Sequence, residues 1–224
     1  NSRLMRTGSA YSYAGVGANE TWLYHAGAGT LNIGPDGAGV VKIVNNGAER
    51  MRIDSSGNVG INGTPSASDG VFRLIQIGGS NKYATFGAQA NGGFAAVMGS
   101  NFYYNGGWKR TDAGRVTKIE TGPDNNSEEL FNFSYAGDGA ADSAITWSEA
   151  MRIDNSGNLL VGTTDPLPNV NNVEGVAISS GSYGGFLAVS RDNATPMGIN
   201  RKTSDGALLD FRKDGSTVGS IESN

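Results

Sequence analysis

The chain has 224 residues and a net charge of −4, and glycine, asparagine and serine, with 35, 22 and 22 copies, make up about a third of it. This mild acidity argues against nucleic-acid binding, which needs a basic stripe, and the lack of cysteine excludes disulfides and thiolate metal sites. No apolar run approaches the roughly 18 residues of a membrane-spanning helix, so we expect a turn-rich β protein without membrane insertion.

Short strands separated by glycine turns are predicted for residues 1–65, which we take as an N-terminal module. Tyr11–Tyr13 and Thr21–His25 are short aromatic runs bounded by glycines. Thr30–Ile33 and Val40–Val44 are β-branched runs on either side of Gly34–Gly37, which is a turn signal. Each of these patterns favours a strand over a helix.

The segment 49–61, ERMRIDSSGNVGI, returns one hundred positions later as 149–161, EAMRIDNSGNLLV. Eight positions are identical in the two copies, and recurrence of this kind usually determines the architecture. Each copy predicts a strand, a turn that opens at Asp54 and closes at Gly57, and a second strand. Gly57 is expected to take a positive φ, as glycine commonly does in such hairpins.

Side-chain parity places Glu49, Met51 and Ile53 on one face of the first strand and Arg52 on the opposite face, where we expect it to meet solvent. One module has too few aliphatic residues to bury this apolar face alone. An uncovered face and its strand edges would aggregate, so other chains are expected to cover Met51 and Ile53. The same argument applies to Met151 and Ile153 in the second copy.

The middle module, residues 66–166, is predicted from runs rich in β-branched and aromatic residues. These runs are Val71–Ile77, Phe94–Met98, Asn101–Trp108, Arg115–Ile119 and the alternating segment Phe131–Tyr135. Ala144–Trp147 is expected to lead into the second repeat as Val40–Val44 leads into the first. No convincing helix is present, although Ser127–Leu130 could form a single turn.

The C-terminal module, residues 167–224, contains strand-like runs at Val176–Ile178, Phe186–Val189 and Ala207–Phe211. Asp214–Gly215 is the signal of a tight hairpin. The segment 211–221, FRKDGSTVGSI, is a candidate for a shortened third copy of the repeat, with Arg212, Asp214 and Val218 in matching places.

Both repeat copies, the stretch NFYYNGGWKR at 101–110 and the ending 200–221 resemble the fibre segments of bacteriophage tail fibres and tailspikes that carry a C-terminal intramolecular chaperone of the endosialidase type. The resemblance implies an all-β, elongated and fibrous parallel homotrimer of repeated β-hairpin modules, similar to a β-prism or a triple-stranded β-helix. The chaperone domain is absent from these residues, so a fragment or a self-cleaved product is expected.

The best candidate for receptor binding is an aromatic and basic cluster in the middle module. Its members are Phe102, Tyr103, Tyr104, Trp108, Lys109 and Arg110. Aromatic rings and polar groups presented on a loop suit stacking and hydrogen bonding to sugars. The alternative is that these rings fill the core of a trimer.

Catalytic and metal chemistry has little support in the sequence. His25 is the only histidine, and no nucleophile motif accompanies it. The repeat turns lack the alternating acidic ligands of a calcium loop. Glu128 or Glu129 with Asp138 or Asp142 could form a carboxylate pair for glycoside hydrolysis, but carboxylates are common on any surface. We therefore expect no enzymatic activity, no cofactor and no metal.

The sequence thus predicts a structural and receptor-binding part of a phage tail fibre, located in the extracellular virion. Its expected partners are two further copies of itself, other tail or baseplate proteins, and host surface polysaccharide or lipopolysaccharide, but no nucleic acid. Two alternatives come from other classes. One is a tailspike-type enzyme that degrades polysaccharide, and the other is a bacterial surface adhesin or filament subunit.

Overall fold

The computed structural model describes residues 33–34, 39–79, 82–90, 95–122, 129–179 and 184–223. The predictions for Tyr11–Tyr13 and Thr21–His25 lie outside these residues. The chain divides into two units, residues 1–34 and 35–224, and the description below concerns the second unit. Strands make up 53% of the described residues and helix 2%, which confirms the prediction of an all-β protein.

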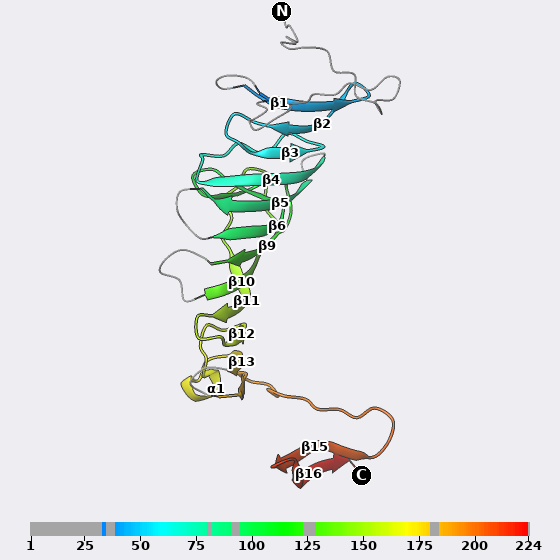
Figure 1. Ribbon diagram of the computed structural model, residues 1–224. Helices are drawn as coiled ribbons and strands as arrows, with labels where there is room; N and C mark the ends of the chain where they lie inside the picture. The colour runs from blue at the N-terminus through cyan, green and yellow to red at the C-terminus, as the bar shows by residue number, and fades with distance from the viewer. Residues whose placement is uncertain are drawn as a thin grey trace, which may run out of the picture. The chain divides into compact units, whose positions relative to one another are not determined.

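Twelve strands form one open sheet in which hydrogen-bonded neighbours follow the order of the chain (Figure 1). They are β1 (Val41–Asn45), β2 (Ala48–Ile53), β3 (Val59–Ile61), β4 (Phe72–Gly79), β5 (Lys82–Gln89), β6 (Ala96–Ser100), β9 (Val116–Thr121), β10 (Glu129–Ala136), β11 (Ser148–Asp154), β12 (Leu159–Val161), β13 (Gly175–Ser179) and β14 (Phe186–Ser190). The pair β3–β4 is parallel and the other pairs are antiparallel. The predicted module boundaries, 65/66 and 166/167, fall in the connections between the paired strands β3 and β4 and between β12 and β13.

Two short hairpins and one helical turn complete the described structure. The hairpins are β7 (Phe102–Tyr104) with β8 (Trp108–Arg110), and β15 (Gly206–Lys213) with β16 (Ser216–Ser223). The helix α1 (Pro168–Asn171) is the only helix of the described residues, and at four residues it is too short to cross a membrane.

Both repeat copies form the predicted strand, turn and strand. In the first copy Asp54 accepts hydrogen bonds from the backbone N–H groups of Ser56 and Asn58, at 2.9 and 2.8 Å, and from the Asn58 side-chain amide at 3.1 Å. Gly57 has a φ of 82° and donates to the Asp54 carbonyl. Asp154 holds the second turn in the same way. The turn chemistry predicted for Asp54 and Gly57 is confirmed.

A β-bulge changes the predicted side-chain faces. The register between β1 and β2 shifts between Ile43 and Val44, so Arg50 is an extra residue without an opposite partner. Met51 and Ile53 share a face, as predicted. Glu49 was predicted on that face and lies instead on the face of Arg52, because the extra residue reverses the alternation. The second copy has the same shift between Phe133 and Ser134.

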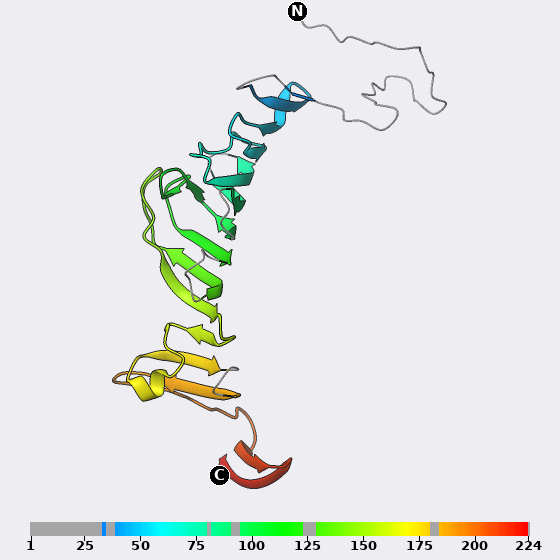
Figure 2. The ribbon, with the colours of Figure 1, turned by 60° about the vertical axis from the view of Figure 1, so that its left-hand side comes forward.

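The middle of the sheet has a hydrophobic core of its own on one face. In β4, Phe72, Leu74 and Gln76 are buried while Ile75 and Ile77 alternate with them and are exposed. The hairpin β7–β8 and the segment 137–147 lie on this buried face, on the same side of the strands (Figure 2). Thr85 Oγ1 and Gln76 Nε2 donate to the Phe102 carbonyl, at 3.0 and 3.3 Å, and fasten the hairpin to the sheet.

Two sequence predictions near the second repeat are wrong. Ala144–Trp147 was expected to be the strand that leads into that repeat, but only Ala144 makes a bridge, to Lys109. The strand β10 pairs with β11 as β1 pairs with β2, although 137–147 separate them in sequence. The helical turn predicted at Ser127–Leu130 is also wrong where it is described, since Leu130 belongs to β10.

Candidate interface on the open face of the sheet

One unbroken row of apolar side chains crosses all twelve strands, with one residue from each strand directly opposite the next. We call it the apolar ladder, and its members are Val41, Ile53, Val59, Ile75, Phe86, Met98, Ile119, Phe133, Met151, Val161, Val176 and Val189. At about 4.8 Å between neighbouring strands, the ladder is about 53 Å long.

The ladder is not covered by the described part of the chain. None of its twelve members is buried, and Ile75, Phe86 and Met98 expose between 42 and 45% of their surface. Further apolar side chains lie beside it on the same face, including Tyr135 and Ile178, each 50% exposed. On the opposite face Leu74 and Leu160 are at most 1% exposed. The rest of the described chain therefore covers one face of the sheet and leaves the ladder face largely open.

An exposed apolar surface of this length is a mark of an interaction surface. Soluble monomers rarely leave large contiguous apolar patches in water. Each Val, Ile, Phe or Met contributes roughly 1.5–3 kcal/mol when it becomes fully buried. A partner that covers the ladder must present an apolar surface of similar length.

The face opposite the ladder carries ion pairs in both repeat copies. Arg52 donates from Nε and Nη2 to both carboxylate oxygens of Glu49, and Lys42 Nζ lies 2.9 Å from Glu49. These cations lower the pKa of Glu49 to about 2, with Arg52 the larger cause. Arg52 lies on the face opposite Met51 and Ile53, as predicted, and its pairing with Glu49 leaves only 19% of its side chain exposed. Arg152 is similarly held by Glu149, at 14% exposure.

The aromatic residues predicted to bind a receptor lie mostly inside the molecule. Phe102 has no exposed surface and Tyr103 only 7%. The Tyr103 hydroxyl donates to Asp142 at 2.8 Å. The pKa of Tyr103 is raised to about 12, mainly by burial of the side chain and to a smaller extent by this hydrogen bond. Tyr104 is half-buried, with its ring 5.1 Å from the ring of Phe72.

Arg110, one of the two basic residues of the predicted binding cluster, is bound mainly by backbone carbonyls. Arg110 is buried and its guanidinium donates to the carbonyls of Gly114, Gly137 and Ala144 and to the Ser143 hydroxyl, at 2.9 to 3.1 Å. A Cβ at Gly139 would lie 2.5 Å from the Arg110 guanidinium carbon, so the two pack in direct contact. Trp108 and Lys109 are half-buried, and with Tyr104 they are the members of the cluster that reach the surface.

A buried lysine joins the aromatic core to the neighbouring polar network. Lys118 Nζ lies 5.2 Å from the centre of the Trp108 ring and 4.9 Å from that of Trp147, and it is paired with Glu120. Cation–π contacts of this kind contribute about 2 kcal/mol when desolvated. Lys118 therefore stabilises the packing of the segment 137–147 on the sheet.

Of the carboxylates considered for glycoside hydrolysis, the structure describes the side chains of Asp138 and Asp142. Asp142 accepts from Tyr103, and Asp138 lies 3.6 Å from Arg115 with 74% of its side chain exposed. Glu128 and the side chain of Glu129 lie outside the described residues, as does His25. Within the described residues no group of three His, Cys, Asp or Glu side chains could hold a metal ion.

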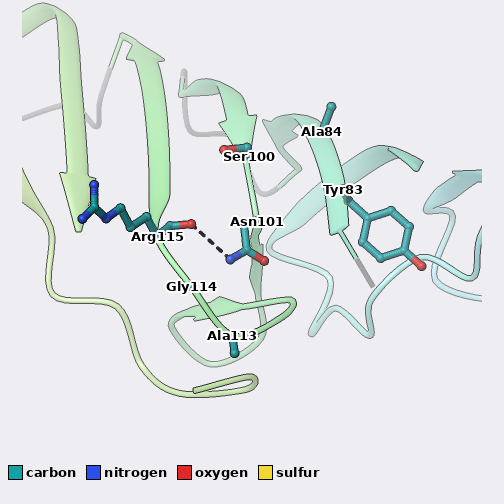
Figure 3. Close-up of a pocket in the computed structure, with 7 residues that line it drawn as sticks. All are labelled: Tyr83, Ala84, Ser100, Asn101, Ala113, Gly114 and Arg115. Atoms are coloured by element: carbon teal, nitrogen blue, oxygen red, sulfur yellow. Dashed lines mark hydrogen bonds between the residues drawn. The ribbon is translucent and has the colours of Figure 1, made fainter. Parts of the chain in front are cut away.

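An open hollow of about 400 Å³ lies where β5, β6 and the loop before β9 meet (Figure 3). Tyr83 and Arg115 stand at its two sides and point away from each other, and the Tyr83 hydroxyl donates to the Thr64 carbonyl. The Asn101 amide donates to the backbone carbonyls of Asp112 and Arg115. Its polar side chains thus serve the fold, and the hollow does not gather free groups toward a ligand.

The sequence pattern predicts separate segments of the ladder but does not show that they form one continuous row. The parity of Met51 with Ile53 and the alternation at Phe131–Tyr135 were both recognised. The signal that could have connected them is the register, which neighbouring strands share only after they pair.

Comparison with family models, with curated proteins and with solved structures finds no match for this chain.

Proposed function

We propose that this chain is a structural segment of a phage tail fibre, assembled as a homotrimer through the apolar ladder and serving attachment to the host surface. The observation that carries the proposal is the ladder itself, in which every one of twelve paired strands contributes an uncovered apolar residue. A second copy of the chain presents a surface of the same length and chemistry. Self-association therefore matches the ladder along its whole extent.

The number of three copies is taken from the resemblance of the repeats to tail-fibre segments. Three sheets that turn their apolar faces to one axis bury all three ladders and leave the opposite faces outside. In this arrangement the ion pairs of Glu49 and Glu149 lie on the outer surface. They are compatible with that position because each carboxylate already has its cations in the same chain.

Host attachment, in this proposal, uses the outer face, since assembly occupies the inner one. The hairpin β7–β8 lies on the outer face and presents the surface parts of Tyr104, Trp108 and Lys109. Aromatic edges beside a cation suit contacts with an acidic surface polysaccharide or lipopolysaccharide. Weak contacts of this kind gain strength when three copies bind together.

Binding of the labelled protein to host cells and to their isolated polysaccharide tests the attachment. Lys109→Glu should weaken binding at least about tenfold, because the loss acts in each copy. Lys202→Glu, a charge reversal at an exposed lysine between β14 and β15, is the control and should retain binding. Equal binding of both variants and the unaltered protein would contradict this role for the hairpin. Release of shortened polysaccharide would instead support the tailspike-type enzyme.

A further inference from the structure

The C-terminal hairpin β15–β16 repeats the register of the hairpin β1–β2. The pairs Leu209–Ile221, Asp210–Ser220, Phe211–Gly219, Arg212–Thr217 and Lys213–Ser216 correspond in order to Val41–Ile53, Lys42–Arg52, Ile43–Met51, Val44–Glu49 and Asn45–Ala48. Both hairpins have a register shift at the same step, so Val218 is the extra residue that corresponds to Arg50.

The turns of these two hairpins also agree. Asn46 and Gly47 have φ angles of 50° and 70°, and Asp214 and Gly215 have 51° and 80°. Two consecutive residues with positive φ are typical of the type I′ hairpin turn. The third copy of the repeat predicted at 211–221 is therefore corrected. Asp214 does not correspond to Asp54, since it occupies the place of Asn46.

In both complete copies a third strand pairs with the outer edge of the second strand, and this pairing starts at the extra residue of the bulge. Asn62 N–H donates to the Arg50 carbonyl at 2.8 Å, and Gly162 N–H donates to the Ala150 carbonyl at 3.0 Å. At the other end Asp54 N–H donates to the Asn58 carbonyl at 2.9 Å, with an equivalent bond in the second copy. The added strands, β3 and β12, have apolar residues at their first and third positions.

The corresponding edge of β16 has no strand beside it among the described residues. By the equivalence with β2, the carbonyl of Val218, the N–H and carbonyl of Ser220 and the N–H of Glu222 point outward from this edge. Ile221, Glu222 and Ser223 align in sequence with Ile53, Asp54 and Ser55. Glu222 and Ser223 still pair with Ala207 and Gly206 of β15, after a second register shift at Leu208, whereas β2 ends at Ile53. A lone two-stranded hairpin is marginally stable in water, and Phe211 and Ile221 are half exposed.

We propose that the outer edge of β16 is an acceptor for a third, antiparallel strand with apolar residues at its first and third positions. The hairpin β15–β16 is then an incomplete copy of the three-stranded unit. The two complete copies define the occupant as an extended polypeptide segment with the chemistry of Val59–Ile61. Such a strand would place its first apolar side chain opposite Ile221 and its third opposite Gly219, as Val59 and Ile61 lie opposite Ile53 and Met51. Both would lie on the side of the sheet that carries the ladder in the first copy. This proposal does not depend on the proposed trimer.

The test supplies that strand within the chain itself. The sequence Gly-Asn-Val-Gly-Ile, copied from residues 57–61, is added after Asn224, so that residues 222 onward imitate the turn and strand that begin at Asp54. Tethering gives the strand a high effective concentration. Amide hydrogen exchange of Ser220 and Glu222, followed by NMR, should slow at least about tenfold relative to the unextended protein. The exchange of Gly219 should change less, because its N–H already faces β15.

Two controls keep the result interpretable. An extension with the two apolar residues replaced, Gly-Asn-Asp-Gly-Asp, should give no protection. Ser220→Pro removes an outward N–H without removing a β15–β16 hydrogen bond, and it should abolish protection of Glu222 by the apolar extension. Fast exchange of Ser220 with both extensions would overturn the proposal. Concentration-dependent protection in the unextended protein would overturn it as well, since a second copy would then already fill the edge.

Discussion

The two complete copies of the repeat, β1–β3 and β10–β12, share their bulge, turn and arginine–glutamate pair, yet the chain leaves them in opposite ways. After β3 it crosses over and adds β4 in parallel, whereas after β12 it returns and adds β13 antiparallel. In the first copy the Asn58 side-chain oxygen accepts from the Leu74 N–H of β4 at 3.1 Å. The repeat is thus a self-contained unit whose edge accepts a strand of either direction.

A second difference lies beside the glutamate that both copies share. In the first copy Glu49 has two cations, Lys42 and Arg52. In the second copy an amide takes the place of the lysine, and Asn132 Nδ2 donates to Glu149 at 2.8 Å. In both complete copies this position therefore supplies a hydrogen-bond donor to the glutamate, charged in the first copy and neutral in the second.

The largest effect is expected for a charge on the ladder. Met151→Asp should place a carboxylate in each of three copies against Phe133 and Val161, and desolvation with mutual repulsion should prevent assembly. Ile53→Asp, the ladder position in the first copy, should act in the same direction. Asn155→Asp in the exposed turn is the control and should leave the mass unchanged in light scattering. An assembled Met151→Asp protein would mean that another surface holds the copies together.

The shared turn predicts equal losses in the two copies. Asp54→Ala and Asp154→Ala each remove an acceptor of two backbone N–H groups and one amide, and each should cost about 2–4 kcal/mol of unfolding free energy. Denaturant unfolding measures both. The equivalence fails if one variant is as stable as the original protein while the other is strongly destabilised. Ser55→Ala, in the same turn and exposed, serves as the control.

The different neighbours of the glutamates predict unequal effects of removing arginine. Arg152→Ala should cost about 1–3 kcal/mol, because Glu149 keeps only the neutral Asn132 amide among its described partners. Arg52→Ala should be milder, because Lys42 remains beside Glu49. Thermal melts of the two variants compare them directly. A reversed order would show that the lysine does not compensate for the arginine.

The smallest effect concerns acid. The pKa of Glu49 is lowered from 4.5 to about 2, so its pairing stabilises the fold fully above pH 4.5 and is lost as the pH falls toward 2. Glu49→Gln should remove this part of the pH dependence of the melting midpoint. The two proteins should therefore differ most above pH 4.5 and converge near pH 2. Parallel curves over this range would contradict the role given to Lys42 and Arg52.

Much of this fold could be predicted from the sequence because its signals are local. The turn at Asp54–Gly57 depends on side-chain chemistry within five residues, and Phe131–Tyr135 alternates clearly. The strand β5 was missed, since glycine and alanine at Gly87 and Ala88 weaken its pattern. A Cβ at Gly87 would lie 2.6 Å from Leu74, so the glycine is required by a packing partner that is distant in sequence.

The outcome was different for the candidate sites. The position of Glu49 depends on a bulge that only pairing reveals. The rings from Phe102 to Trp108 look like a binding loop in sequence, but the sheet face beneath them is apolar, and they pack on it. Interior and exposed aromatic residues have the same composition, so a one-dimensional pattern does not distinguish them.

The central claim is that copies of this chain cover one another's ladders, and the mass of the protein in solution tests it most directly. Sedimentation equilibrium should give about 70 kDa, three times the chain mass of 23.2 kDa. Hydrogen exchange on the same sample should show protection of strand amides along the whole sheet, because the edges and the apolar face are covered. A mass of 23.2 kDa at all concentrations, with the ladder exposed to solvent, would contradict the account.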